Sequence, residues 1–259
     1  MSRLLAALLL LLFATSSLAA QRIIVLAPAA ADIIKKLDAA ELVVGKTRNV
    51  QEFPKAKKVG SHIRPNLEII TSLEPDLLII SSNSFFSQEM AEAVKAETLF
   101  YNPDNLEEIL EQTHKLALRI DRAEQATVLI EKQREKLRQI RPVSRPPKVM
   151  YEISESPLTI AGRGHVLADM IESAGGEFIT GGQAKMLRFN PEAVLSLQPD
   201  IYLWQVGPMN QNPTAPEKRG HYRSLNAEYL QVDQLQYSRA NTTSFDNVLQ
   251  LNHYFRERQ

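Results

Sequence analysis

Short apolar runs of strand length recur along the chain and alternate with segments whose apolar residues have helical spacing. The runs are largely continuous, which is typical of strands buried on both faces of a parallel sheet. In chain order they lie at 22–27, 41–45, 77–80, 148–152, 201–204 and 229–232. Helical spacing occurs at 32–37, 67–73, 166–174 and 246–255. This alternation predicts an α/β fold in which helices cover parallel strands.

The middle of the chain, from 104 to 140, has helical spacing almost throughout and predicts two helices that meet near Ile120. Each helix is preceded by a pair of residues spaced as a cap and its reciprocating carboxylate, Asp104 with Glu107 and Asp121 with Glu124. The second helix is rich in Glu, Lys, Gln and Arg, and its ~20 residues would span about 30 Å. Prolines within 141–147 end it. A long polar helix at mid-chain indicates a strut between two lobes.

An internal repeat supports the two-lobe prediction. Residues 66–76 recur at 190–200 with six identical positions in eleven and no gap. Each copy predicts a capped helix, a proline stop and then an apolar strand. We therefore predict an N-terminal lobe at 21–118, a linking helix at 119–141 and a C-terminal lobe at 142–259.

The first twenty residues have the three-part layout of a secretory signal peptide. Arg3 precedes an apolar run at 4–13, and small residues at 14–20 form a cleavage region. The alternative, a membrane anchor, needs about 20 apolar residues, roughly twice the length of this run. We predict cleavage after Ala19 or Ala20, and no later segment is long and apolar enough to span a membrane.

Cysteine is absent and the formal charges balance, with 30 basic and 30 acidic residues. Without cysteine there is no lipid attachment point after the signal and no thiolate chemistry, which favours a free protein in the periplasm. A chain with balanced charges lacks the excess of basic residues that is expected of a nucleic-acid binder. No Gly-x-Ser-x-Gly elbow, His-Glu-x-x-His pair or phosphate loop occurs. We expect a binding protein and not an enzyme, acting as a monomer.

The segment 66–79 closely resembles a hallmark of one family. It reads Asn-Leu-Glu-Ile-Ile and, after two further residues, Leu-x-Pro-Asp-Leu-Leu-Ile. This is the family of periplasmic binding proteins for cobalamin, haem and ferric siderophores. Other segments that fit are 22–26, 58–60, 168–176 and the repeat around Glu192. The resemblance covers nearly the whole chain after the signal and becomes weak after Pro208.

The resemblance implies two Rossmann-like lobes joined by a single long α-helix, with a ligand cleft between the lobes. It implies no intrinsic cofactor, and delivery of the ligand to the permease dimer of an ABC transporter with its cytoplasmic ATPase. In the family, one glutamate on each lobe meets permease arginines, a role that falls here on Glu68 and Glu192. The alternative for both is stabilisation of a helix N-terminus by a first-turn carboxylate.

Several loop residues are candidate ligand contacts. His62 falls where relatives place a ligand-facing residue, and the tyrosine usual beside it in haem-binding relatives is Ser61 here. Arg163 and His165 occupy a loop at the carboxyl end of a predicted strand, where α/β lobes bind ligands. Imidazole ligates metals and donates to anions, so His62 or His165 is a possible direct metal ligand. Arg239 adds a further cation near the cleft mouth.

Two aromatic residues, Phe85 and Trp204, lie at the predicted cleft edges of the two lobes and could stack on a planar ligand. Core packing is the alternative for both. With basic and histidine candidates outnumbering acids, an iron chelate is the favoured ligand, with a ferric siderophore ahead of haem. Cobalamin and a bare metal ion remain alternatives, although no dense cluster of metal ligands is evident. A sensing role also remains open.

Overall fold

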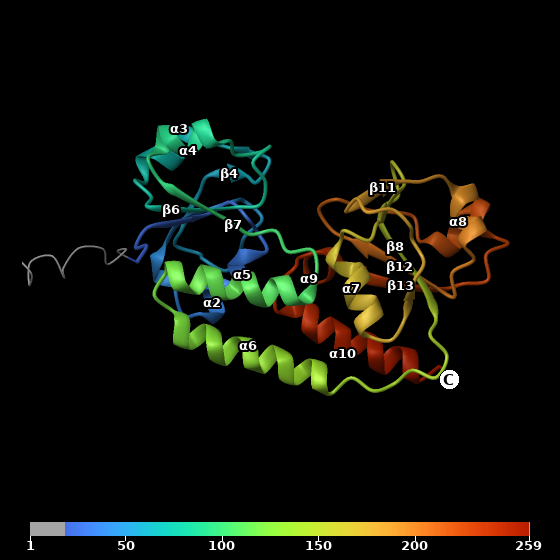
Figure 1. The fold of residues 1–259 in the computed structure, drawn as a ribbon. Helices are drawn as coiled ribbons and strands as arrows, with labels where there is room; N and C mark the ends of the chain where they lie inside the picture. The colour runs from blue at the N-terminus through green and yellow to red at the C-terminus, as the bar shows by residue number, and fades with distance from the viewer. Residues whose placement is uncertain (1–18, 259) are drawn as a thin grey trace, which may run out of the picture.

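The computed structural model describes residues 19–258, so the predicted signal peptide lies almost entirely outside the described residues. Two α/β lobes lie side by side, each built on its own sheet (Figure 1). The fold class predicted from the apolar runs is confirmed. Between residues 19 and 258 no helix combines the length and the apolarity that crossing a membrane requires.

The N-terminal lobe is built on a five-stranded sheet in the order β3-β2-β1-β6-β7, in which every pair is parallel. Its strands are β1 Ile23–Val25, β2 Val43–Lys46, β3 Lys57–Lys58, β6 Leu77–Ile80 and β7 Glu97–Phe100, and a small hairpin comprises β4 Gly60–Ser61 and β5 Arg64–Pro65. One face packs against α2 Ala30–Lys36 and the other against α3 Leu67–Ser72 and α4 Gln88–Val94. The strand predicted at 77–80 is buried at every position, as a central parallel strand must be.

The C-terminal lobe has a mixed sheet in the order β11-β9-β8-β12-β13, with β10 alongside the start of β8. Its strands are β8 Lys148–Ser154, β9 Thr159–Ala161, β10 Glu177–Phe178, β11 Met186–Arg188, β12 Ile201–Val206 and β13 Glu228–Asp233. Its helices are α7 Val166–Ser173, α8 Pro191–Leu197, α9 Gln234–Tyr237 and α10 Thr243–Arg256. The pairs β8–β12 and β12–β13 are parallel, so their carboxyl ends meet at one edge of the sheet.

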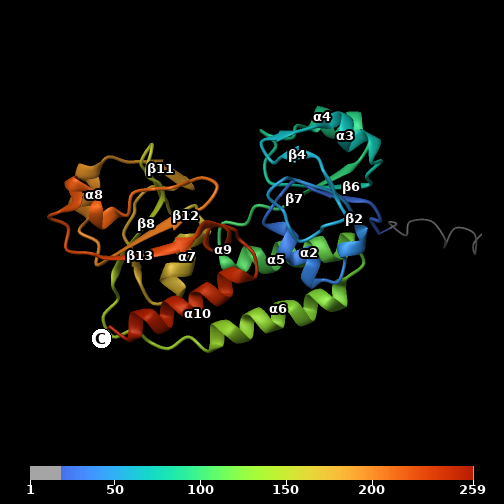
Figure 2. The same ribbon diagram turned by 180° about the vertical axis from the view of Figure 1, so that it is seen from behind.

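The long helix predicted at mid-chain is α6 Ala123–Arg138, which runs along one side of the molecule beside α10 (Figure 2). The preceding helix, α5 Leu106–Arg119, also couples the lobes. Leu106 and Ile109 at its start pack in the core of the C-terminal lobe, whereas Leu116 near its end packs in the N-terminal core. Two helices therefore bridge the lobes in the described structure, and the boundary at residue 118 remains a prediction.

The two helix caps predicted from spacing are wrong by one residue each. The N-cap of α5 is Asn105, whose side chain accepts a hydrogen bond from the Glu108 backbone N–H at 2.9 Å, because the Asp104 carboxylate is engaged elsewhere. The N-cap of α6 is Arg122, which has no side-chain cap. Asp121 has a left-handed backbone with a φ of 55°, unlike the extended backbone that a capping residue adopts.

The sequence repeat is also a structural repeat. In both copies, 66–76 and 190–200, an asparagine caps the helix and the ninth residue adopts a left-handed backbone, Glu74 at φ 45° and Gln198 at φ 46°. The final aspartates of the two copies also make equivalent hydrogen bonds. Asp76 accepts a hydrogen bond from the backbone N–H of Arg22 just before β1, and Asp200 accepts one from Lys148 at the start of β8. The lobes therefore share one local design around the strand that follows the repeat.

Several polar contacts join the lobes. The buried Tyr101 hydroxyl donates to the Ala240 carbonyl at 3.1 Å, and the Thr242 hydroxyl donates to the Asp32 carboxylate at 2.6 Å. An ion pair between Lys136 of α6 and Asp246 of α10, at 2.6 Å, joins these two helices. Together these contacts fix the position of one lobe relative to the other.

Replacing Tyr101 with Phe should lower the free energy of unfolding by about 1–3 kcal/mol, because the Ala240 carbonyl would stay buried without its donor. Tyr229→Phe is the matched control. The Tyr229 hydroxyl is buried and has no hydrogen-bond partner among the described residues, so its loss should change stability by less than about 0.5 kcal/mol. Urea denaturation of both variants measures the difference, and equal stabilities would contradict the bridging role of Tyr101.

Candidate ligand-binding cleft

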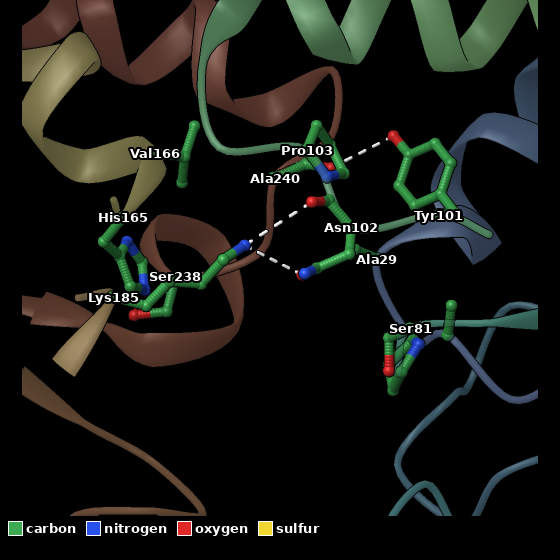
Figure 3. A pocket seen from close by; sticks show the side chains of 12 residues that line it. Ala29, Ser81, Tyr101, Asn102, Pro103, His165, Val166, Lys185, Ser238 and Ala240 are labelled. Atoms are coloured by element: carbon green, nitrogen blue, oxygen red, sulfur yellow. Dashed lines mark hydrogen bonds between the residues drawn. The ribbon is translucent and has the colours of Figure 1, made fainter. Parts of the chain in front are cut away.

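A cavity of about 130 Å³ lies between the lobes and is lined from both of them (Figure 3). The N-terminal lobe contributes residues 27–29 after β1, Ser81 after β6 and residues 101–103 after β7. These segments follow the carboxyl ends of parallel strands, where α/β sheets commonly bind ligands. Pockets for drug-sized ligands occupy roughly 300–1,000 Å³. The cavity is therefore large enough for a functional group or a few waters, and smaller than a whole chelate.

The C-terminal wall of the cavity contributes a histidine and a lysine, His165 and Lys185. The Lys185 ammonium donates to the side-chain oxygen of Asn102 at 2.9 Å and forms an ion pair with Asp104. Lys185 precedes β11, whereas Asn102 and Asp104 follow β7, so these contacts cross the cleft. Sequence reasoning missed Lys185, and its only signal was a cationic residue in a glycine-containing loop between two strands.

His165 is the N-cap of α7, and its Nδ1 atom accepts a hydrogen bond from the backbone N–H of Leu167 at 3.3 Å. Burial, with a further contribution from the positive charge of Lys185, lowers the pKa of His165 from 6.5 to about 4. At neutral pH the ring is therefore uncharged. Because Nδ1 accepts, the ring proton lies on Nε2, and the imidazole can donate one hydrogen bond.

The depressed pKa of His165 predicts a stability that falls on acidification. Between pH 6.5 and about 4 the unfolded chain binds a proton at this histidine and the folded chain does not, so stability decreases as the pH falls through that range. The expected loss is about 1–3 kcal/mol. Asparagine is a good N-cap and does not titrate, so a His165→Asn variant should lose less stability than the wild type. Urea denaturation at pH 7 and pH 4.5 tests this, and equal losses would contradict it.

A second group of candidates gathers around His62, between β4 and β5. The ring of Phe85, 40 % exposed, meets the imidazole edge-on at 6.0 Å between centroids. Partial burial, together with the positive charges of Arg48 and Arg239, lowers the pKa of His62. Arg239 comes from the C-terminal lobe and donates to the Asn49 carbonyl at 2.8 Å. The structure thus brings His62, Phe85 and Arg239 into one region where the lobes meet.

Two predicted contacts lie elsewhere. Trp204 is 6 % exposed and packs in the C-terminal core with Met150 and Tyr222. Arg163 forms an ion pair with Glu172 of α7 at 2.9 Å and donates to the Phe178 carbonyl at 3.2 Å. Neither residue lines the interlobe cavity, and their roles in ligand binding stay predictions. Among residues 19–258 no three His, Cys, Asp or Glu side chains are grouped so that they could hold a metal ion.

The profile of a family described as "Periplasmic binding protein" matches residues 23–218, which is most of the chain. The chain belongs to the periplasmic binding protein family. A periplasmic binding protein holds a solute and does not transform it, in agreement with the prediction that the chain is not an enzyme. Comparison with curated protein sequences gave no match.

Several solved structures share this fold. The vitamin B12 binding protein BtuF of Vibrio cholerae is 20 % identical with a TM-score of 0.75, and the match covers 93 % of this chain and 99 % of that one. The haem-binding protein BhuT, in complex with two haems, is 19 % identical with a TM-score of 0.77 over 91 % and 98 % of the two chains. IsdE of S. aureus, complexed with haem, is 20 % identical with a TM-score of 0.73 over 90 % and 98 %.

In this periplasmic binding protein, Glu68 and Glu192 occupy equivalent places on the two lobes. Each is exposed in the first turn of a helix, Glu68 on α3 and Glu192 on α8. Within the part of the chain that the structure describes, neither carboxylate forms an ion pair. Both are therefore available to a partner surface, while the helix N-terminus next to each stabilises its charge.

Proposed function

We propose that this chain is the periplasmic solute-binding component of an ABC importer, which captures an iron chelate between its lobes and delivers it to a membrane permease. Membership of the periplasmic binding protein family supports a carrier role. We infer the class of ligand from the hydrogen-bond donors and cationic side chains that lie where the lobes meet. The signal-like segment 1–20 supports export to the periplasm, and we expect the carrier to act as a monomer.

The cleft chemistry favours an anionic ligand. Lys185 lines the cavity and Arg239 lies beside His62, each with a carboxylate partner at its side. No carboxylate is among the described residues that line the cavity. Cations at a cleft raise the local concentration of anions and stabilise them after binding. An anionic ferric siderophore or haem carries the negative charge and the bulk that this arrangement suits.

The exposed Phe85 ring at the cleft supports a ligand with a flat or bulky apolar part. BhuT and IsdE, two structural neighbours, were solved with haem bound, and BtuF binds vitamin B12. We infer that the metal arrives inside its chelator and is recognised through the chelator's periphery. His62 and His165 remain the two side chains proposed for any direct contact with iron.

Calorimetric titration of the mature protein with haemin, cyanocobalamin, ferric citrate and a neutral ferric trihydroxamate tests this proposal. We expect saturable one-to-one binding of an iron chelate. Arg239→Ala should weaken the binding of that chelate roughly 10-fold, since charge-assisted hydrogen bonds are about twice as strong as neutral ones. Calorimetry is preferable to tryptophan fluorescence because Trp204 is buried in the C-terminal core.

Arg145→Ala is the matched control, because Arg145 is an exposed arginine in the segment after α6, away from the cavity. Its affinity should equal that of the wild type. Exclusive binding of cyanocobalamin would replace the iron chelate with cobalamin as the ligand. Absence of binding to every compound in the panel would contradict the proposed function.

A further inference from the structure

The interlobe cavity is lined by hydrogen-bond donors on opposite walls. Lys185 and His165 face it from the C-terminal lobe, and Ser81 faces it from the N-terminal lobe (Figure 3). His165 contributes its Nε2–H, because its Nδ1 atom already accepts from Leu167. A space with a cation, an imidazole donor and a hydroxyl, and with no carboxylate in its described lining, suits an oxyanion.

The size of the cavity sets what can enter it. At about 130 Å³ it is well below the roughly 300–1,000 Å³ of pockets that hold drug-sized ligands. A carboxylate group fits this space, whereas a macrocycle or a complete chelate does not. The rest of such a ligand would lie outside the cavity.

Asp104, the ion-pair partner of Lys185, can be replaced by another anion. The Asp104 side chain is 46 % exposed and that of Lys185 is 35 % exposed, so water competes with their ion pair. The only other side-chain interaction of Asp104 in the described structure is an electrostatic one with His165, and release from Lys185 would leave its carboxylate in contact with solvent. Asn102, which accepts from the same ammonium at 2.9 Å, holds the lysine at the cleft after such an exchange.

We propose that Lys185 binds a carboxylate group of the ligand inside the interlobe cavity, and that this group takes the place of Asp104. The inference rests on the proposed function and adds a substrate class to it, a metal chelate that carries a free carboxylate. Lys185 is then a specificity-determining residue, and Asp104 is a competitor that occupies the lysine until the ligand arrives.

Replacement of Asp104 by the ligand and a purely structural Lys185–Asp104 ion pair predict different results for two substitutions. If Lys185 binds the ligand, Lys185→Met removes the attraction and weakens affinity, whereas Asp104→Asn removes the competitor and strengthens it. If the Lys185–Asp104 pair only bridges the lobes, both substitutions break the same contact and change affinity in the same direction. The signs of the two effects therefore separate the alternatives.

The test is calorimetric titration of the wild-type, Lys185→Met, Lys185→Arg and Asp104→Asn proteins with the same panel. Haemin and ferric citrate carry carboxylates, whereas cyanocobalamin and a neutral ferric trihydroxamate do not. We expect a carboxylate-bearing chelate to bind, Lys185→Met to weaken it roughly 10-fold or more, Lys185→Arg to restore part of the loss, and Asp104→Asn to tighten binding several-fold. Lys115→Met, at an exposed site on α5, is the control and should match the wild type.

Wild-type binding of only the neutral compounds would overturn this inference and leave a carrier function standing. The same holds if a carboxylate-bearing chelate binds with equal affinity to the wild type and Lys185→Met, or if both substitutions change affinity in one direction. Failure of the wild type to bind any compound would overturn the proposed function and this inference together. Circular dichroism and thermal melting confirm that each variant is folded.

Discussion

A Glu68→Lys/Glu192→Lys double variant is expected to lose at least about tenfold in solute uptake while it keeps the wild-type affinity for the solute. The two carboxylates are exposed on equivalent helices of the two lobes, so a permease built from two similar subunits can meet one on each side. Like-charge contacts at an interface cost several kcal/mol, enough to prevent docking. Uptake of a labelled chelate by cells, with calorimetry on the purified variant, measures both quantities.

The matched control for this prediction is Glu89→Lys/Glu124→Lys. These two glutamates are also exposed in the first turn of a helix, on α4 and α6, so their reversal carries a similar helix-dipole cost of about 0.3–1 kcal/mol each. The control should support normal uptake. Normal uptake by the Glu68→Lys/Glu192→Lys protein would exclude a docking role for these residues.

An Arg219→Met variant should lose about 3–5 kcal/mol of stability, because it leaves the Glu152 carboxylate buried without its counter-charge. Glu152 is fully buried on β8 and Arg219 is 5 % exposed in the segment between β12 and β13. The guanidinium donates to both carboxylate oxygens, at 2.6 and 2.8 Å. The Tyr202 hydroxyl of β12 donates to the same carboxylate, and burial and this charge raise the pKa of Tyr202.

A second substitution identifies the cause of the loss. In Arg219→Met/Glu152→Gln no charge is buried, so the double variant should be more stable than Arg219→Met alone. Urea denaturation of both proteins, with the wild type, gives the three free energies of unfolding. A loss below about 1 kcal/mol in Arg219→Met would show that water reaches the carboxylate and that the pair does not anchor the segment.

The sequence predicted the elements best where burial is complete. The runs at 77–80 and 201–204 are strands because both faces of a central parallel strand pack against helices, which leaves a continuous apolar pattern. Helix ends were harder to place. Asp104 has a suitable side chain for a cap, but a tertiary contact with Lys185 engages it, and Asn105 caps α5 instead. Contacts between distant residues leave no periodic signal along the chain.

The candidate site was predictable only as far as loops could be assigned to strand ends. His165 was assigned in this way, His62 from the family resemblance and Arg239 as a cation near the cleft mouth. All three lie where the lobes meet. Trp204 was placed at a cleft edge because its apolar run ends there, yet β12 continues to Val206 and the indole packs in the core. Lys185 could not be found from its neighbours in sequence, because its contacts are with Asn102 and Asp104 across the cleft.

The position of the metal in a complex tests the proposed carrier most directly. A crystal of the mature protein with its bound ferric chelate, measured at the iron absorption edge, locates the iron by anomalous scattering. We expect the iron between the lobes, bounded by Ser81 and Phe85 on one side and by His165 and Arg239 on the other. Iron on the outer face of either lobe, with the space between the lobes free of ligand, would contradict binding in the cleft.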